Sequence, residues 1–485
     1  MHISSLPGNT GIGTLGKYAY QFVDYLKKYG QTYWQMLPIC PTSYGDSPYQ
    51  SFSTFAGNPY FIDFEKLEED GLLCRSDWDG VDWGSDEHRV DYGLLYVERH
   101  KVFAKIQENF SRHVPADFEA YCAENAFWLD DYALFMAIKD AHAGAAFSSW
   151  EPGIKLREDA ELRAWSDRCS RRVQYYKILQ YLFFKQWYEL KRYANGKGIK
   201  IIGDIPIYVS SDSSDVWTNP RQFVLHADRS PVEVAGCPPD AFSADGQLWG
   251  NPVYDWDYHK QTGYAWWKKR ISECLKVYDV IRIDHFRGFD EYYCIPFGAA
   301  TAKDGCWRKG PGAGLFAELK KDFGEMNIIA EDLGYLTDSV IQMLKDVGFP
   351  GMKVLQFAFD SREESNYIPY LYGRNSVVYT GTHDNDTILG WAKSARAEDV
   401  AFAKKYLRAD SDGELREEML ISALRCVANT CILCMQDLIG LGGEARMNVP
   451  STVGSNWKWR ASEGQISDGA FSLLGYYGSL YGRGR

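Results

Sequence analysis

The chain has 485 residues, of which 45% are hydrophobic and 24% charged, so it is long enough for a large core and has the composition of a soluble globular protein. The net charge of −12 argues against nucleic acid or an anionic membrane surface as a partner. No apolar run approaches the roughly 18 residues that a membrane-spanning helix needs, and the start of the chain lacks the pattern of a secretory signal. Eleven cysteines without a framework spacing indicate reduced thiols in a cytoplasmic protein.

The N-terminal region is predicted to contain short strands and one long shaped loop. Residues 2–13 read as a short strand followed by a Gly/Pro loop, and residues 18–29 have the apolar spacing of a helix that Gly30 ends. Residues 34–39 (WQMLPI) form the next predicted strand. Residues 41–60 are rich in Pro, aromatic and hydroxyl side chains, a composition that is too irregular for a helix and indicates a loop shaped over a site.

Helical patterns dominate the next hundred residues. The apolar spacing predicts helices over 94–110, 117–142 and 162–193, with one apolar and aromatic side on the last. Because these helices lie between two predicted strands, we interpret residues 60–195 as a mainly helical insertion into one catalytic domain that spans residues 1–485. The apolar stripe of the last helix indicates packing and implies no cofactor.

The rest of the chain alternates strands and helices. Thr337 is a predicted N-cap of a helix that reaches Val347, with Gly348 just past its end. Further helices are expected at 414–428 and, on the surface, at 466–480. A long loop insertion, residues 205–270, contains the turn-rich segment 237–256. The predicted strands are 199–209, 277–286, 326–334, 352–359, 376–386 and 431–438.

Together these patterns predict an α/β fold with about eight strands. Alternating strands and helices indicate a parallel sheet, and eight such units with charged residues at the strand ends indicate a closed (β/α)8 TIM barrel with long irregular loops over its C-terminal face. An open doubly wound sheet is the competing fold, but the first strand is not followed by a Gly-rich dinucleotide fingerprint.

Charged side chains gather at the ends of these predicted strands. The segment VIRIDHFRG, residues 280–288, passes from a buried β-branched run into a block of charge. The same change recurs elsewhere, so that strand ends supply four carboxylates: Asp204, Asp284, Glu331 and Asp384. No metal-ligand spacing joins them, the CxxC of residues 431–434 lacks a second ligand pair, and a Gly-x-Ser-x-Gly elbow is absent from the sequence.

Several carboxylates in one cleft suit glycosyl transfer. That chemistry needs one carboxylate as a nucleophile and one carboxylic acid as a proton donor, and a third carboxylate can steady positive charge in the transition state. Like charges raise the pKa of one member, which keeps the donor protonated. The 16 Trp, 33 Tyr and 25 Phe also provide flat faces that suit sugar rings.

At this point the sequence resembles a known family. The blocks GDIPIYV, RIDHFRG, AEDLG and GTHDND look like four conserved segments of the α-amylase superfamily. The loops SLPGNTGIGTLG, YGDSPYQSFSTFAGNP, PPDAFSADGQLWGNPVYDW and RMNVPSTVGSNWKWR resemble those of the 4-α-glucanotransferases (amylomaltases or disproportionating enzymes, glycoside hydrolase family 77). The match runs in order from about residue 3 to 460. Family members usually carry an apolar run ahead of SLPG, so we expect the first strand to be short.

The resemblance implies a retaining reaction that moves α-1,4-glucan segments of maltooligosaccharides, starch or glycogen onto another glucan or glucose, without a metal or another cofactor. It implies that Asp284 is the nucleophile, that Glu331 is the acid and base, and that Asp384 holds the sugar at the cleavage point. The remaining residues that it implies in substrate binding are Arg282, His383, Asp204, Ser47, Tyr49, Asp240, Gln247, Trp249 and Asn251.

Alternatives remain open from the sequence alone. Glu331 could be a helix N-terminal acid, with Asp332 the functional carboxylate. Trp249, in a polar turn, is interpreted as a sugar platform, whereas Trp457 and Trp459 fit a core and a platform equally well. A hydrolase of the same fold would use the same three carboxylates, so these residues do not separate it from a transferase. Loops 41–60 and 237–256 would favour a sugar acceptor if they exclude water. A non-catalytic glucan-binding protein is the rival from another class.

Overall fold

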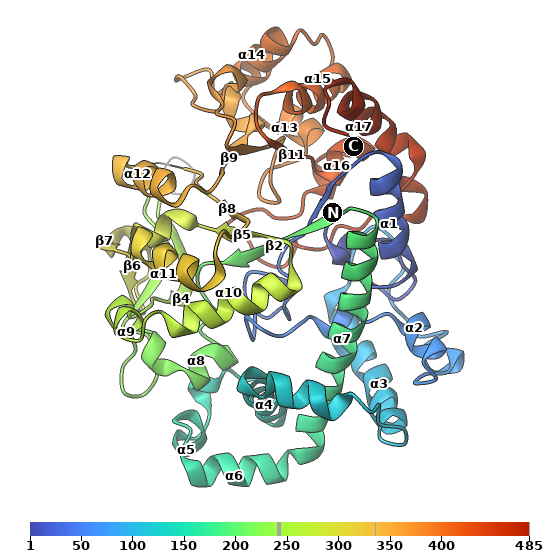
Figure 1. Cartoon of the computed structure of the whole chain (residues 1–485), viewed down its shortest axis with the longest axis vertical. Helices are drawn as coiled ribbons and strands as arrows, with labels where there is room; N and C mark the ends of the chain where they lie inside the picture. The colour runs from blue at the N-terminus through green and yellow to red at the C-terminus, as the bar shows by residue number, and fades with distance from the viewer. Residues whose placement is uncertain (240–243, 335, 485) are drawn as a thin grey trace.

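A parallel sheet forms the centre of the protein in the computed structural model, which describes residues 1–239, 244–334 and 336–484. Within the described residues seven parallel strands follow one another around a barrel, in the order β1-β2-β5-β8-β9-β10-β11 (Figure 1). They are β1 (Tyr33–Gln35), β2 (Lys200–Pro206), β5 (Val280–Asp284), β8 (Ile328–Ala330), β9 (Gly351–Val354), β10 (Ser376–Tyr379) and β11 (Thr430–Ile432). The predicted TIM-barrel class is confirmed.

The strand predicted within residues 2–13 is wrong. Ile3–Ser5 form a 3-10 helix, and the backbone of this segment pairs with itself, from the Leu6 N–H to the Ile3 carbonyl and from the Gly13 N–H to the Ser4 carbonyl. A strand needs successive backbone bonds to a neighbour, and local turns take those groups here. The described part of the barrel therefore has a gap between β1 and β11, bordered by His2 and by a cavity.

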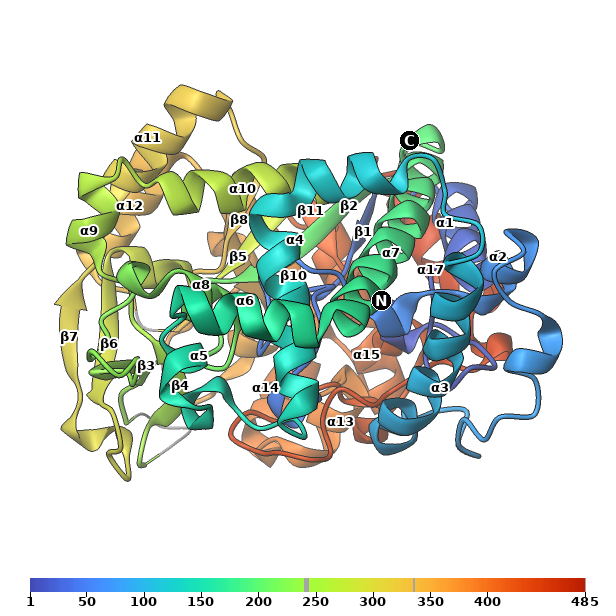
Figure 2. The ribbon, with the colours of Figure 1, turned by 90° about the horizontal axis from the view of Figure 1, so that it is seen from below.

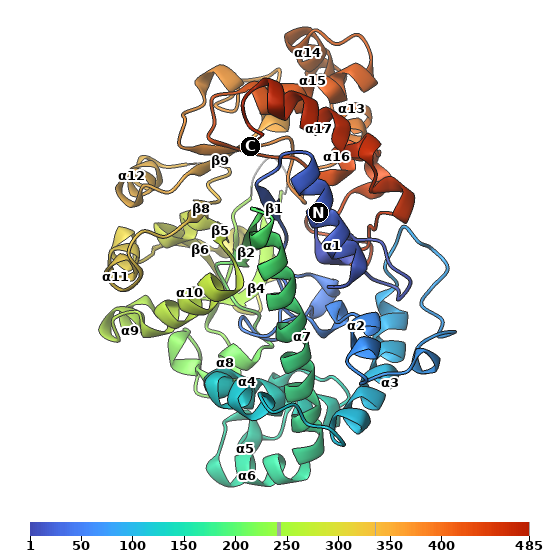
Figure 3. The same ribbon diagram turned by 45° about the vertical axis from the view of Figure 1, so that its right-hand side comes forward.

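Helices surround the sheet, and residues at their ends help to set their limits. The helix α12 (Asp338–Val347) starts after an extended Thr337, and Gly348 ends it in the left-handed region with φ 74°. Its predicted limits are confirmed. Figure 3 shows α1 and α17 side by side on one flank. The other helices beside the barrel are α1 (Lys17–Lys28), α10 (Ala265–Val277), α11 (Ala313–Phe323), α13 (Ile388–Ser394), α14 (Ala397–Leu407), α15 (Asp412–Arg425), α16 (Met435–Ile439) and α17 (Asp468–Leu480).

The helical region between β1 and β2 lies at one end of the molecule (Figure 1). Its long helices are α3 (Tyr92–Phe110), α4 (Phe118–Ala141) and α7 (Ser170–Gly196), and α4 packs on α7 through aromatic contacts such as Trp128 with Phe184. The single helix predicted over 162–193 is in fact α6 (Asp159–Arg168) followed by α7, because the chain leaves the helical conformation at Cys169. Short helices are α2 (Phe64–Glu69), α5 (Pro152–Lys155), α8 (Ser214–Thr218) and α9 (Trp256–Gln261).

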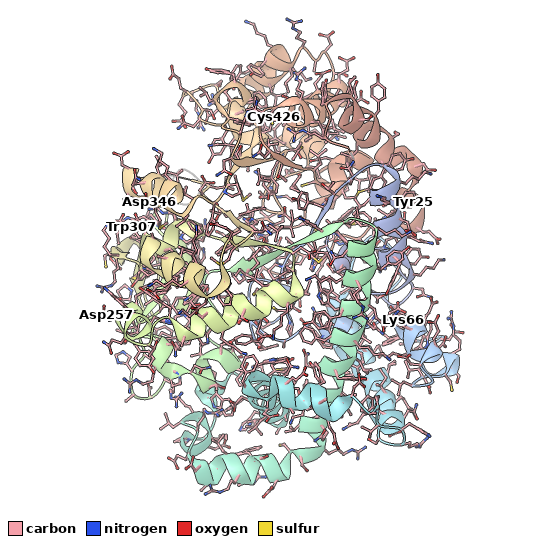
Figure 4. The ribbon with its side chains drawn as sticks, viewed as in Figure 1. Tyr25, Lys66, Asp257, Trp307, Asp346 and Cys426 are labelled. Carbon is pink, nitrogen blue, oxygen red and sulfur yellow. The ribbon has the colours of Figure 1, made fainter. Side chains whose placement is uncertain are left out.

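A second, antiparallel sheet was not anticipated. Its order is β4-β3-β6-β7, with β3 (Glu233–Cys237), β4 (Gln247–Pro252), β6 (Glu291–Pro296) and β7 (Cys306–Lys309). Figure 2 shows these strands together on one flank, and Trp307 of β7 lies there in Figure 4. The prediction of a turn-rich loop over 237–256 is therefore wrong in part, since β4 lies inside it. Among the described residues, no helix is long and apolar enough to cross a bilayer.

Candidate active site

Strand register brings the predicted carboxylates to one rim of the barrel. In the β2–β5 pair Asp204 lies opposite Arg282, and Pro206 lies opposite Asp284. In the β5–β8 pair Ile283 lies opposite Ala330, so Asp284 and Glu331 leave the ends of neighbouring strands. Neighbouring strands are about 4.8 Å apart, so these two carboxyl groups are close neighbours. His285, which follows Asp284 in the chain, donates its N–H to Glu331 across 46 positions.

One guanidinium binds two of the carboxylates. Nη1 of Arg282 donates to both oxygens of Asp204, at 2.7 and 2.6 Å, and to Oδ1 of Asp284 at 3.0 Å. Asp204 and Arg282 are only 1% and 3% exposed. Burial lowers the pKa of Arg282, but Asp204 and then Asp284 raise it well above its usual range, so the guanidinium stays charged. This buried cation pairs with both Asp204 and Asp284.

Glu331 has a different environment, because its two oxygens accept hydrogen bonds from neutral backbone donors. The His285 N–H donates to Oε2 and the Leu333 N–H donates to Oε1, each at 2.7 Å. Burial and then the charge of Asp284 raise the pKa of Glu331 from 4.5 to about 7. The left-handed backbone of His285, with φ 51°, turns the chain after β5. A carboxyl group with this pKa can give and take a proton near neutral pH.

The neighbouring Asp332 has a structural environment instead. It is 8% exposed, and its Oδ1 accepts the Met352 N–H of β9 at 2.6 Å. Burial raises the pKa of Asp332, against that hydrogen bond. Between the two carboxyls left open by the sequence, this geometry favours Glu331, which is less buried than Asp332 and is influenced by the charge of Asp284.

His383 and Asp384 follow β10 and lie beside Tyr49 from the loop 41–60. Nε2 of His383 is 3.3 Å from Oδ1 of Asp384, whose side chain is 46% exposed. The Tyr49 ring stacks on the His383 ring with centroids 4.9 Å apart, and its hydroxyl donates to Oδ2 of Asp204 at 2.8 Å. The described structure thus brings Asp204, Asp284, Glu331 and Asp384 to one site.

The remaining sequence-predicted residues that the structure describes lie in the loop 41–60 and on β4. Trp249 packs edge-to-face on His285 at 4.8 Å, and its indole N–H donates to Oε1 of Gln247 at 3.1 Å. Asn251 is buried and donates to the Val209 carbonyl at 2.7 Å. Ser47 accepts the Tyr49 N–H at 3.2 Å. Asp240 lies outside the described residues. Sugar contacts by this group stay predictions.

Two residues near Asp384 were missed by the sequence analysis. Asn448 donates from its side-chain amide to Oδ1 of Asp384 at 2.6 Å, and Arg446 donates to the Asp384 carbonyl at 2.5 Å. Both belong to the block RMNVPSTVGSNWKWR, so the signal was the polar pair Arg446 and Asn448 on either side of an apolar Met447. Trp457 and Trp459 are each 6% exposed, which places both in the core. The Trp457 ring packs against Tyr49 and His383.

The site consists of carboxylates, the guanidinium groups of Arg282 and Arg446, and aromatic rings. Across the described parts of the chain, His, Cys, Asp and Glu side chains form no group of three or more that could hold a metal ion. A carboxylate beside a fixed cation and a carboxyl group with a raised pKa match the two groups that a retaining glycosyl transfer needs, and a third carboxylate can stabilise positive charge in the transition state.

Comparisons with known proteins agree with this chemistry. A glycoside hydrolase family 77 model, described as 4-alpha-glucanotransferase, matches residues 1–466. The 4-alpha-glucanotransferase of Clostridium butyricum is 48% identical over 485 residues, 100% of both chains. That of Thermus thermophilus is 44% identical over 479 residues, 96% of this chain and 95% of its own.

Solved structures give the same result. The amylomaltase of Streptococcus agalactiae, solved in complex with acarbose, has a TM-score of 0.98 at 44% identity and is matched over 100% of this chain and 99% of its own. The amylomaltase of Corynebacterium glutamicum, at 19% identity and a TM-score of 0.77 over 99% of this chain and 73% of its own, shares the fold. The chain therefore belongs to the 4-alpha-glucanotransferases of glycoside hydrolase family 77, the family that its sequence blocks resemble.

Proposed function

We propose that the protein transfers α-1,4-glucan segments from a donor to the 4-hydroxyl of another glucan or of glucose, with Asp284 as nucleophile and Glu331 as acid and base. In the first step a carboxylate oxygen of Asp284 bonds to the anomeric carbon while the glycosidic bond breaks, and the Glu331 proton goes to the leaving 4-oxygen. In the second step the acceptor hydroxyl gives its proton to Glu331 and displaces Asp284. Two displacements retain the configuration of the sugar.

The contrast between two adjacent carboxyl groups carries this proposal. Asp284 accepts a hydrogen bond from the buried Arg282 cation at 3.0 Å, whereas among the described residues Glu331 accepts hydrogen bonds from two backbone N–H groups and has its pKa raised to about 7. A nucleophile has to be ionised and an acid protonated at the same pH, and these environments favour that division. In this proposal Asp384 and His383 hold the hydroxyls of the sugar at the cleavage point, and Asp384 stabilises the positive charge of the transition state.

Transfer rather than hydrolysis requires that an acceptor sugar outcompetes water. The loop 41–60 contributes Tyr49, whose ring lies on His383, and the β4 segment contributes Trp249 beside His285. The aromatic rings of Tyr49 and Trp249 support a site that favours a sugar over water. We also propose a cytoplasmic location, since all eleven cysteines are free thiols and a reducing compartment keeps them so.

The experiment is incubation with maltotriose and chromatography of the products. We expect glucose together with a ladder of longer maltooligosaccharides, whereas reducing ends that rise without longer chains would refute transfer. Asp284→Asn should lose essentially all turnover and still bind maltooligosaccharides. Asp290→Asn is the matched control, because Asp290 lies six residues further on and accepts a hydrogen bond from Ser339; it should keep the ladder. A chain that shows no turnover before substitution would instead be a glucan-binding protein.

A further inference from the structure

The exposed carboxylate Asp384 is oriented by a segment that is remote in sequence. The Asn448 amide nitrogen donates to Oδ1 of Asp384 at 2.6 Å, and His383 Nε2 lies 3.3 Å from that same oxygen. Within the described part of the chain, no donor forms a hydrogen bond with Oδ2 of Asp384. One oxygen is therefore held by the protein, and the other remains available on a side chain that is 46% exposed.

The backbone around this hydrogen bond is fixed as well. The Asn448 N–H donates to the His383 carbonyl at 3.1 Å. Arg446 donates from Nη2 to the Asp384 carbonyl at 2.5 Å and from Nε to the Asn448 carbonyl at 2.8 Å. The first two bonds join the two segments, and the third holds the Arg446 side chain to the Asn448 backbone, so the Asn448 side chain approaches Asp384 with little freedom.

The segment that carries Asn448 is itself anchored to the helical region. The Tyr92 hydroxyl at the start of α3 donates to the Trp457 carbonyl at 3.2 Å, and the Val90 N–H donates to the Lys458 carbonyl at 2.7 Å. Asn456 closes the loop internally by accepting the Val449 N–H at 3.0 Å. The helical region, which contributes none of the strand-end carboxylates, thereby supports their geometry.

We propose that Asn448 is a positioning residue for Asp384, holding Oδ1 so that Oδ2 faces the sugar at the cleavage point. This role rests on the proposed function, in which Asp384 contacts that sugar. The amide type matters because an amide donates a hydrogen bond without bringing a positive charge. A Lys or Arg at this place would orient Asp384 but also neutralise the charge that stabilises the developing cation. The charged and titratable groups that surround Asp384 are His383, Arg446 and Tyr49.

The main test compares Asn448→Ala and Asn448→Asp in steady-state transfer from maltotriose. Asn448→Ala should lower kcat and kcat/KM together by 10- to 100-fold with little change in KM, because an interaction that matters in the transition state is lost. Asn448→Asp keeps the shape of the side chain but replaces the donating amide with a second carboxylate, which then faces the Asp384 carboxylate without a proton to donate. It should lose more than Asn448→Ala at pH 8, and its activity relative to the unchanged protein should rise several-fold toward pH 5.5, where the two carboxyls can share a proton.

Two further variants separate positioning from loop order. In an Asp384→Asn background, Asn448→Ala should cost less than threefold, since its partner carboxylate is already gone. Asn456→Ala loosens the same loop without touching Asp384, and its kcat should fall much less than that of Asn448→Ala. Additive losses in the double variant, equal losses in the two loop variants, or an Asn448→Asp activity ratio that is flat with pH would each overturn the proposal. A protein that makes no ladder from maltotriose would refute the proposed function instead.

Discussion

Glu331→Gln gives the sharpest test of the electrostatics of the site, because it removes one titrating group and keeps its shape. The pKa of Glu331 is raised from 4.5 to about 7 by burial and by Asp284. At about 1.4 kcal/mol per pKa unit, ionising this group in the folded protein costs about 3 kcal/mol more than in the unfolded chain. The cost is absent below pH 4.5, where both states are protonated, and it is complete above pH 7.

The stability of the unchanged protein should therefore contain a component that falls as pH rises from about 4.5 to about 7, since the folded state binds the extra proton. Glu331→Gln lacks this component. Its free energy of unfolding, relative to the unchanged protein, should rise by about 3 kcal/mol over that interval. A second effect is independent of pH: an amide has one acceptor oxygen, so one of the two backbone N–H groups loses its partner at a cost of about 1–3 kcal/mol.

The assay is urea unfolding followed by tryptophan fluorescence at several pH values from 5 to 8. Only the change with pH tests the argument, because the lost hydrogen bond shifts all points equally. Glu325→Gln, at a carboxyl that is 86% exposed, is the control for the substitution itself. A difference between Glu331→Gln and the unchanged protein that stays flat or falls with rising pH would show that Glu331 is not the protonated member of the pair.

Three further predictions follow from the same contacts. The kcat/KM for maltotriose should fall tenfold per pH unit above about 7, because Glu331 has to donate a proton; a rate that is constant from pH 6 to 9 would contradict this. Asp204→Asn should lower the free energy of unfolding by about 3–5 kcal/mol in urea titrations, since Arg282 loses a buried partner, and a loss below 1 kcal/mol would argue against it. Trp457→Ala should cost about 3–5 kcal/mol in the same titrations, and Trp457→Phe clearly less.

Local chemistry made part of the fold predictable. The end of α12 follows from Gly348, which takes the left-handed conformation there, whereas Thr337 stands at the start in an extended conformation without a side-chain capping bond. The ends of β5 and β8 were visible because buried apolar runs change abruptly to charge. By contrast, the antiparallel sheet depends on the pairing of β3 with β6, which begins with Glu233 opposite Pro296. Strands of four to six residues carry no periodic signal that reveals such a pairing.

The same distinction applies to the site. Asp284 and Glu331 could be found because each ends a strand whose register the barrel dictates. Asn448 acts on Asp384 across 64 positions and from an irregular segment, so residue type alone does not indicate its role. Whether Trp457 is core or platform is decided by the rings that it meets, Tyr49 and His383, which come from two other loops.

The different environments of Asp284 and Glu331 depend on the position of Arg282. Arg282 precedes Asp284 by two residues on β5, so both side chains lie on the same face of that strand. Its Nη1 reaches Asp204 on one neighbouring strand and Asp284 on its own. Glu331 follows the other neighbouring strand, β8, and its donors within the described residues are two backbone N–H groups, so burial dominates its pKa. A neutral side chain at position 282 would leave Asp204 and Asp284 without the cation that they share, and a buried carboxylate that loses its cation is destabilising.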